Sequence, residues 1–235
     1  MNLLSIGGSD PSSGAGIQSD VRIFSKFDVQ CLTVITSITG QNTSDFGKIE
    51  PVSKKILENE LKSIITDFKI DGIKIGMVYN SEIIKVIYKY LKKLDVPIVV
   101  DPVIKSTTGG MLIEKSAIVD FKKFIIPLAT IITPNKFEAE ILTNTKINSK
   151  NDMIIAGKLL QKLGAKNVLI KGGHLDHKTV QDIFVNKSEI KIFTSRRYKT
   201  KNTHGTGCTL SSAIATYLSC GKPIKKSCEL GINYV

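Results

Sequence analysis

Short runs rich in β-branched residues alternate along this chain with longer amphipathic segments, and this alternation limits the possible folds more than any other feature. Strands are predicted at residues 3–6, 32–38, 72–75, 98–101, 130–133 and 167–171, and helices at residues 14–27, 52–68, 81–93, 114–125, 135–143 and 152–163. Strands that alternate with helices of this length form right-handed crossovers and a mostly parallel sheet with helices on both faces. The sequence therefore predicts an α/β fold of three layers, αβα.

Residues 179–194 break this alternation. Two runs, 180–185 and 189–193, alternate polar and apolar residues on either side of Asn186-Lys187-Ser188, which predicts an antiparallel hairpin at one edge of the sheet. The sequence contains no linker, low-complexity tract or internal repeat. We therefore expect a single domain over residues 1–235.

The composition excludes several classes of function. The net charge is +12, but the lysines are dispersed singly or in pairs and aromatic residues make up only 6%, so no footprint for nucleic acid is expected. No apolar run approaches the roughly 20 residues of a membrane span, and the N-terminus lacks the pattern of a signal peptide. The four cysteines and three histidines form no zinc-ligand spacing. We expect a cytoplasmic protein that binds neither nucleic acid nor membrane.

In folds of this class, ligands bind beyond the carboxyl ends of the parallel strands, on the loops that follow them. The loops in question are residues 7–15, 39–45, 76–80, 101–110, 133–138 and 171–174, where glycines and polar residues gather. We expect the functional site to be built from these loops.

The segment HGTGCTL, residues 204–210, begins a predicted final helix at residues 205–218. Gly205 and Gly207 let successive backbone N–H groups point into one concavity, and the N-terminus of a helix attracts negative charge. The spacing favours an anion hole over a simple glycine cap. Cys208 lies in the first turn, where its thiol is expected to shift toward the thiolate.

Charged residues lie near three other loops. The glycine-rich segment at residues 5–20 lacks the Gly-Lys-Ser/Thr of a P-loop, and Asp20 at its end fits either the mouth of the sheet or a solvated helix surface. Asp101 and Lys171 end two predicted strands. A lysine before two glycines is well placed to meet nucleotide phosphates, although a solvated strand end fits both residues as well.

Asn135 and Glu138 lie three residues apart at the start of a predicted helix. Two interpretations stay open. Together they could hold Mg²⁺ through water, because magnesium prefers oxygen ligands, or they could cap the helix and complement its dipole.

Six motifs taken in order make a family resemblance visible: GSDPSSGAGIQSD, VITSITGQNT, KIGMV, ITPNKFEAE, LIKGGH and KNTHGTGCTLSSA. They closely resemble the hydroxymethylpyrimidine/phosphomethylpyrimidine kinases of thiamine biosynthesis, which belong to the ribokinase-like superfamily. The resemblance implies a ribokinase-like fold and the use of ATP and Mg²⁺. It also implies phosphorylation of 4-amino-5-hydroxymethyl-2-methylpyrimidine, and then of its monophosphate.

The resemblance implies roles for single residues in substrate binding. Gln41 matches the family glutamine that reads the aminopyrimidine edge, and its side-chain amide offers both a donor and an acceptor. Four further positions are implied to line the same pocket: Gly8, Asp20, Met77 and Val103.

For the nucleotide and metal, the resemblance implies that Lys171, Asn135 and Thr206 contact ATP. Glu138, Asn135 and Asp101 are implied to organise Mg²⁺, through water.

For catalysis, the resemblance implies that Gly205, Thr206 and Gly207 form the anion hole beside Lys171. Cys208 stands where most ribokinase-like enzymes carry an aspartate base. It is implied to take or orient the hydroxymethyl proton. A strong base is not required, because positioning and electrostatic stabilisation contribute most to the rate of phosphoryl transfer.

Two further expectations follow from the resemblance, one on the last helix and one on the oligomeric state. Relatives continue past GINYV with one more helix, so the chain is expected to lack the last helix of the family, and relatives are commonly homodimers.

The nearest alternative function is a pyridoxal or pyridoxine kinase, because some of these enzymes share the GTGC signature. A non-catalytic binding regulator is a second alternative, against which Lys171, Glu138 and the complete GTGC argue.

Overall fold

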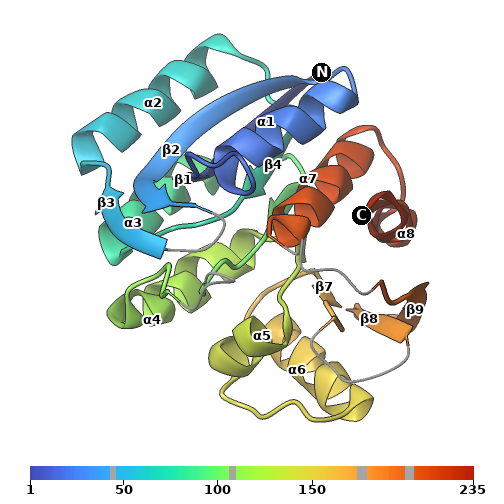
Figure 1. The fold of residues 1–235 in the computed structure, drawn as a ribbon. Coiled ribbons are helices and arrows are strands. Elements are labelled where there is room, and N and C mark those ends of the chain that lie inside the picture. The colour runs from blue at the N-terminus through green and yellow to red at the C-terminus, as the bar shows by residue number, and fades with distance from the viewer. Residues whose placement is uncertain (43–45, 106–109, 174–178, 199–203) are drawn as a thin grey trace.

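A computed structural model describes residues 1–42, 46–105, 110–173, 179–198 and 204–235. The described strands form one sheet in the order β3-β2-β1-β4-β5-β6-β7-β8-β9 (Figure 1). Their bounds are β1 (Asn2–Ser9), β2 (Gln30–Gln41), β3 (Phe46–Pro51), β4 (Gly72–Ile75), β5 (Ile98–Val100), β6 (Ile131–Ile132), β7 (Asn167–Ile170), β8 (Thr179–Val185) and β9 (Ile190–Arg196).

The six central strands pair in parallel, in the spatial order β2, β1, β4, β5, β6 and β7. At the two edges, β3 on one side and β8 and β9 on the other pair antiparallel. The register aligns Ile6 of β1 with Ile75 of β4, and Ile75 with Val100 of β5. The carboxyl ends of these strands therefore meet at one edge of the sheet. The predicted mostly parallel α/β fold with an antiparallel edge hairpin is confirmed.

Helices cover both faces of the sheet. Their bounds are α1 (Gly16–Lys26), α2 (Lys54–Asp67), α3 (Ser81–Leu91), α4 (Ile118–Asp120), α5 (Lys136–Thr143), α6 (Lys150–Lys162), α7 (Thr206–Ser219) and α8 (Ile224–Tyr234). One apolar core joins the sheet to α2, α3, α5 and α6, and a second joins its other face to α1, α7 and α8 (Figure 1). The arrangement is the predicted αβα sandwich.

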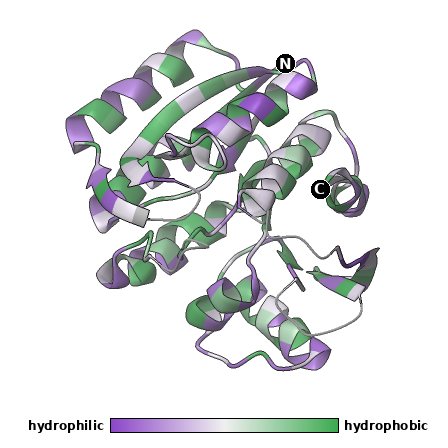
Figure 2. Cartoon of the chain, viewed as in Figure 1, coloured by the Kyte–Doolittle hydropathy of each residue, from purple (hydrophilic) through white to green (hydrophobic). Residues whose placement is uncertain are grey.

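Helix α7 is enclosed on several sides because it packs against the sheet, α1 and α8. Its buried residues include the small polar Ser211 and Ser212 beside the apolar Ile214. Figure 2 shows α7 mostly in white and green, whereas α2 alternates purple and green along its length. None of the helices in the described ranges has the length and apolarity needed to cross a bilayer.

Three elements differ from the sequence predictions. Helix α8 was not predicted, because the face that it buries carries the small residues Ser227, Cys228 and Gly231 and no clear apolar stripe. Strand β3, paired antiparallel with β2, was not predicted because its sequence, FGKIEP, is short and lacks a clear apolar alternation. The helix predicted at residues 114–125 is present but irregular. A 3₁₀ turn at Lys115–Ala117 precedes α4, and a π turn at Phe121–Ile125 leads into a 3₁₀ turn that contains Pro127. Proline has no N–H to continue an α-helical ladder.

Candidate active site

A cavity of about 670 Å³ opens at the carboxyl edge of the parallel strands. Its walls come from the loops after β1, β2, β4, β5, β6 and β7, together with the start of α7. These are the loops expected from the topology, although residues 43–45, 106–109 and 174 of those loops lie outside the described residues, as do residues 201–203 of the KNTHGTGCTL motif.

The cavity brings together all but one of the predicted site residues. The lining residues among them are Gly8, Gln41, Met77, Asp101, Val103, Asn135, Glu138, Lys171, Gly205, Thr206, Gly207 and Cys208. Their positions in sequence span nearly the whole chain, so the fold assembles them. Their individual roles remain predictions.

Asp20 is the exception, and its predicted place in the pocket is wrong. Its side chain is fully buried behind the cavity, where both carboxylate oxygens contact Lys74 Nζ, at 3.0 and 2.8 Å. Asp20 lies on the inward face of α1, with Ile17 and Phe24 one turn away on either side. This placement also excludes the solvated surface position.

The start of α7 depends on close backbone packing. Gly205 precedes the helix with φ +79°, and a Cβ there would lie 1.8 Å from the carbonyl oxygen of Gly14. A Cβ at Gly207 would lie 3.1 Å from Lys171 Nζ. Only glycine fits at 205, and glycine at 207 keeps the first turn of α7 open toward Lys171. The glycine cap is therefore present, and the anion hole stays a prediction.

Two polar residues that were not predicted hold this turn against the loop after β1. His204 Nε2 lies 2.9 Å from Asp10 Oδ2, and both residues line the cavity. The Asp10 carboxylate also accepts from the N–H groups of Ser12 and Ala15. Their positions inside two of the recognised motifs were a signal, but the contact joins residues far apart in sequence.

Cys208 is a buried thiol at the floor of the cavity, 8% exposed. Burial raises the pKa of Cys208 to about 11, with Lys74 opposing and Asp101 and Asp20 adding to the rise. The expected shift toward thiolate is therefore wrong. The desolvation of a charged sulfur outweighs the favourable helix terminus.

Lys171 lies between two carboxylates, Asp101 directly after β5 and Glu138 in the first turn of α5. Its Nζ is 3.0 Å from Asp101 Oδ1 and 3.9 Å from Glu138 Oε2. Burial alone would lower the pKa of Lys171, but Asp101 and Glu138 outweigh it, so the pKa is raised and the ammonium is charged. Lys171 is therefore not a solvated strand end.

Asn135 and Glu138 form a capping box on α5. Asn135 Oδ1 accepts from the Glu138 N–H at 3.0 Å, and Glu138 Oε2 accepts from the Asn135 N–H at 2.7 Å. Burial raises the pKa of Glu138 to about 7, although Lys171 opposes this rise. The capping interpretation is confirmed, and the magnesium role stays a prediction.

Comparison with known proteins identifies the family. The sequence profile described as phosphomethylpyrimidine kinase matches residues 10–235. The chain belongs to this family.

A solved phosphomethylpyrimidine kinase from Clostridium difficile 630 is 41% identical, with a TM-score of 0.88 over 100% of this chain and 97% of that one. An ADP complex of Bacillus subtilis pyridoxal kinase is 30% identical, with a TM-score of 0.92 over 100% and 90% of the two chains. A thiamine biosynthesis bifunctional protein from Geobacter sulfurreducens is 37% identical over the whole of this chain, which spans about half (48%) of its length.

Proposed function

We propose that this protein is an ATP-dependent kinase that phosphorylates 4-amino-5-hydroxymethyl-2-methylpyrimidine and then its monophosphate. The observation that carries the proposal is the single cavity in which Lys171, between Asp101 and Glu138, faces the glycine turn of α7 while Gln41 lies at the end of β2. A cationic phosphate site and an amide-bearing pocket for a small ring share one space.

The acceptor is expected to bind between Gln41 and the walls formed by Gly8, Met77 and Val103. The Gln41 amide can pair with an aminopyrimidine, which offers a donor and an acceptor on one edge. Met77 packs tightly against Gly8, because a Cβ at residue 8 would lie 2.8 Å from the Met77 sulfur. Met77 and Gly8 therefore form one continuous part of the cavity wall, against which the ring is expected to lie.

Phosphoryl transfer needs positioning and charge stabilisation more than a strong base. In this proposal Lys171 contacts the transferred phosphoryl group, and the N–H groups at the start of α7 donate to its oxygens. Because Cys208 is a neutral thiol at pH 7, we assign it a role in orienting the acceptor hydroxyl and not in removing its proton beforehand.

The residues present fit Mg²⁺ held through water. The described residues contain no cluster of three or more His, Cys, Asp or Glu side chains that could hold a metal by themselves. Asp101 and Glu138 supply two carboxylates in the cavity, and Mg²⁺ in such sites keeps several waters and takes its other ligands from substrate phosphates. The ion would neutralise charge on the nucleotide phosphates.

Pyridoxal kinase is the second candidate, because solved pyridoxal kinases share the fold at 30% identity. One assay separates the two functions. ATP consumption is measured with hydroxymethylpyrimidine, its monophosphate and pyridoxal offered separately. Turnover of both pyrimidines supports the proposal, and turnover of pyridoxal alone overturns the substrate assignment. Binding of a pyrimidine without any turnover supports a regulator.

A further inference from the structure

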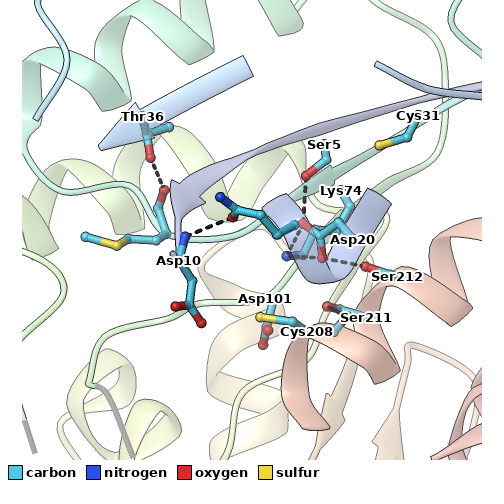
Figure 3. A network of polar contacts seen from close by, with 12 residues as sticks. Ser5, Asp10, Asp20, Cys31, Thr36, Lys74, Asp101, Cys208, Ser211 and Ser212 are labelled. Carbon is cyan, nitrogen blue, oxygen red and sulfur yellow. Dashed lines mark hydrogen bonds and ion pairs between the residues drawn. The ribbon is translucent and has the colours of Figure 1, made fainter. Parts of the chain in front are cut away.

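A fully buried ion pair lies behind the acceptor end of the cavity. Lys74 on β4 and Asp20 on α1 are 1% and 0% exposed at their side chains, with Nζ 2.8 Å from Oδ2. Removing two charges from water is expensive, and additional hydrogen bonds are needed to offset it. Ser5 Oγ and Ser212 Oγ supply them by donating to Asp20 at 2.6 and 2.7 Å (Figure 3).

These bonds hold Asp20 from three sides. Ser5 belongs to β1, Lys74 to β4 and Ser212 to α7, so one carboxylate ties two central strands to the helix that carries Cys208. In Figure 3 the pair lies between β1 and α7, with Cys208 and Asp101 close by. The Lys74 ammonium is therefore fixed in position relative to the start of α7.

Lys74 has a donor left over. An ammonium has three N–H groups, and within the described part of the chain both of its hydrogen bonds go to Asp20. Lys74 nevertheless lines the cavity, whereas Asp20 does not. The side chain that carries this donor thus borders the cavity, and its counter-charge does not.

The position of this donor is at the acceptor end. A Cβ at Gly76 would lie 2.9 Å from Lys74 Nζ, and Gly76 directly precedes Met77, which packs on Gly8. Burial alone would lower the pKa of Lys74, but Asp20 outweighs it, so the pKa is raised and the ammonium keeps its charge.

We propose that Lys74 donates its remaining N–H to the acceptor oxygen that receives the phosphoryl group, and that it thereby lets the cavity hold an anionic phosphate acceptor as well as a neutral hydroxymethyl one. The inference rests on the proposed function. A phosphate monoester carries about −1.5 to −2 charge at pH 7, and charge-assisted hydrogen bonds to it are roughly twice as strong as neutral ones. A neutral hydroxyl gains less from the same donor.

The test is calorimetric titration without ATP, using hydroxymethylpyrimidine and its monophosphate as separate probes. Lys74→Met combined with Asp20→Asn removes both charges and leaves none unpaired. We expect its affinity for the monophosphate to fall about tenfold or more and its affinity for the hydroxymethyl compound by less than about threefold. Ser5→Ala, which removes one hydrogen bond to Asp20 and keeps both charges of the pair, should retain the preference for the monophosphate. Equal losses for both probes in the double variant would overturn the inference.

A second measurement on the unaltered protein covers the case in which the variants do not fold. With ¹⁵N-labelled lysine, the slowly exchanging ammonium signal of a buried lysine should shift on addition of the monophosphate. No shift at saturation overturns the inference. If the unaltered protein neither binds nor turns over either pyrimidine, the proposed function itself has failed. If it does both and the double variant keeps its preference, only the role of Lys74 has failed.

Discussion

The Lys171 ammonium donates to Asp101 Oδ1 across 3.0 Å, which joins the end of β7 to the end of β5 although β6 lies between them in the sheet. An isolated bridge between Asn135 and Lys171 extends the same edge. One cation therefore sits at the meeting point of three strand ends, where a nucleotide phosphate is expected.

Lys171→Gln removes this charge and keeps a side chain of similar reach. We expect kcat/KM for ATP to fall about 100- to 1000-fold, because a charge aimed at the transferred group contributes mainly in the transition state. Steady-state kinetics with varied ATP measures the loss. Lys191→Gln, at an exposed position on β9, is the control and should keep the normal rate. A similar loss in both variants would point to a general charge effect and contradict the assignment.

Glu138 should make the stability depend on pH. Burial raises the pKa of Glu138 from 4.5 to about 7. The folded protein therefore binds a proton between these values that the unfolded chain has released. The contribution of Glu138 to the free energy of unfolding is therefore present in full below pH 4.5 and is lost as the pH rises toward 7. The total loss is up to about 3 kcal/mol.

Urea unfolding at pH 5 and pH 8 tests this dependence. The Glu138→Gln variant imitates the protonated acid and should lose less unfolding free energy than the unaltered protein between the two pH values. The exposed Glu114→Gln is the control. If Glu138→Gln shows the same pH dependence as the unaltered protein, Glu138 is not the group that titrates.

Cys208 should behave as an unreactive thiol. With its pKa raised to about 11 by burial, little thiolate exists at pH 7.5, and alkylation requires the thiolate. Iodoacetamide should modify the exposed Cys220 about ten times faster than Cys208, or more, and peptide mass spectrometry can follow both reactions.

Cys208→Ser should lower kcat and leave measurable activity. A fully normal rate in that variant would remove Cys208 from the reaction.

Gln41→Ala tests recognition of the acceptor ring. Removing one partner of a hydrogen bond in a binding site typically costs about 1–3 kcal/mol, so KM for hydroxymethylpyrimidine should rise roughly 10- to 100-fold. KM for ATP should change little, because Lys171 and the start of α7 remain in place. Equal rises for both substrates in the same kinetic assay would show that Gln41 supports the cavity as a whole.

Sequence patterns predicted the sheet and the loops well, because strands buried on both faces read as continuous apolar runs such as residues 98–100. They predicted side-chain environments poorly. Asp20 lies on the same face of α1 as Ile17 and Phe24, so its burial could have been inferred from the helical period of 3.6 residues. Its partner Lys74 is 54 residues away and could not. Likewise, HGTGC indicates a helix start, whereas the desolvation that keeps Cys208 neutral depends on what packs around it.

Gly205 and Gly221 provide a matched pair for the turn that begins α7. Both have positive φ, +79° and +74°, but a Cβ at 205 would lie 1.8 Å from Gly14 O, whereas a Cβ at 221 would meet nothing within 4 Å. In Gly221→Ala, only the strain of a side chain at positive φ should lower the free energy of unfolding, by about 1–2 kcal/mol. Gly205→Ala must also push Gly14 away, together with the loop after β1 that contacts His204. We expect Gly205→Ala to unfold at clearly lower urea concentration than Gly221→Ala, and to lose phosphoryl transfer while Gly221→Ala keeps it. Equal stability and activity in the two variants would mean that close packing of this turn does not matter for the site.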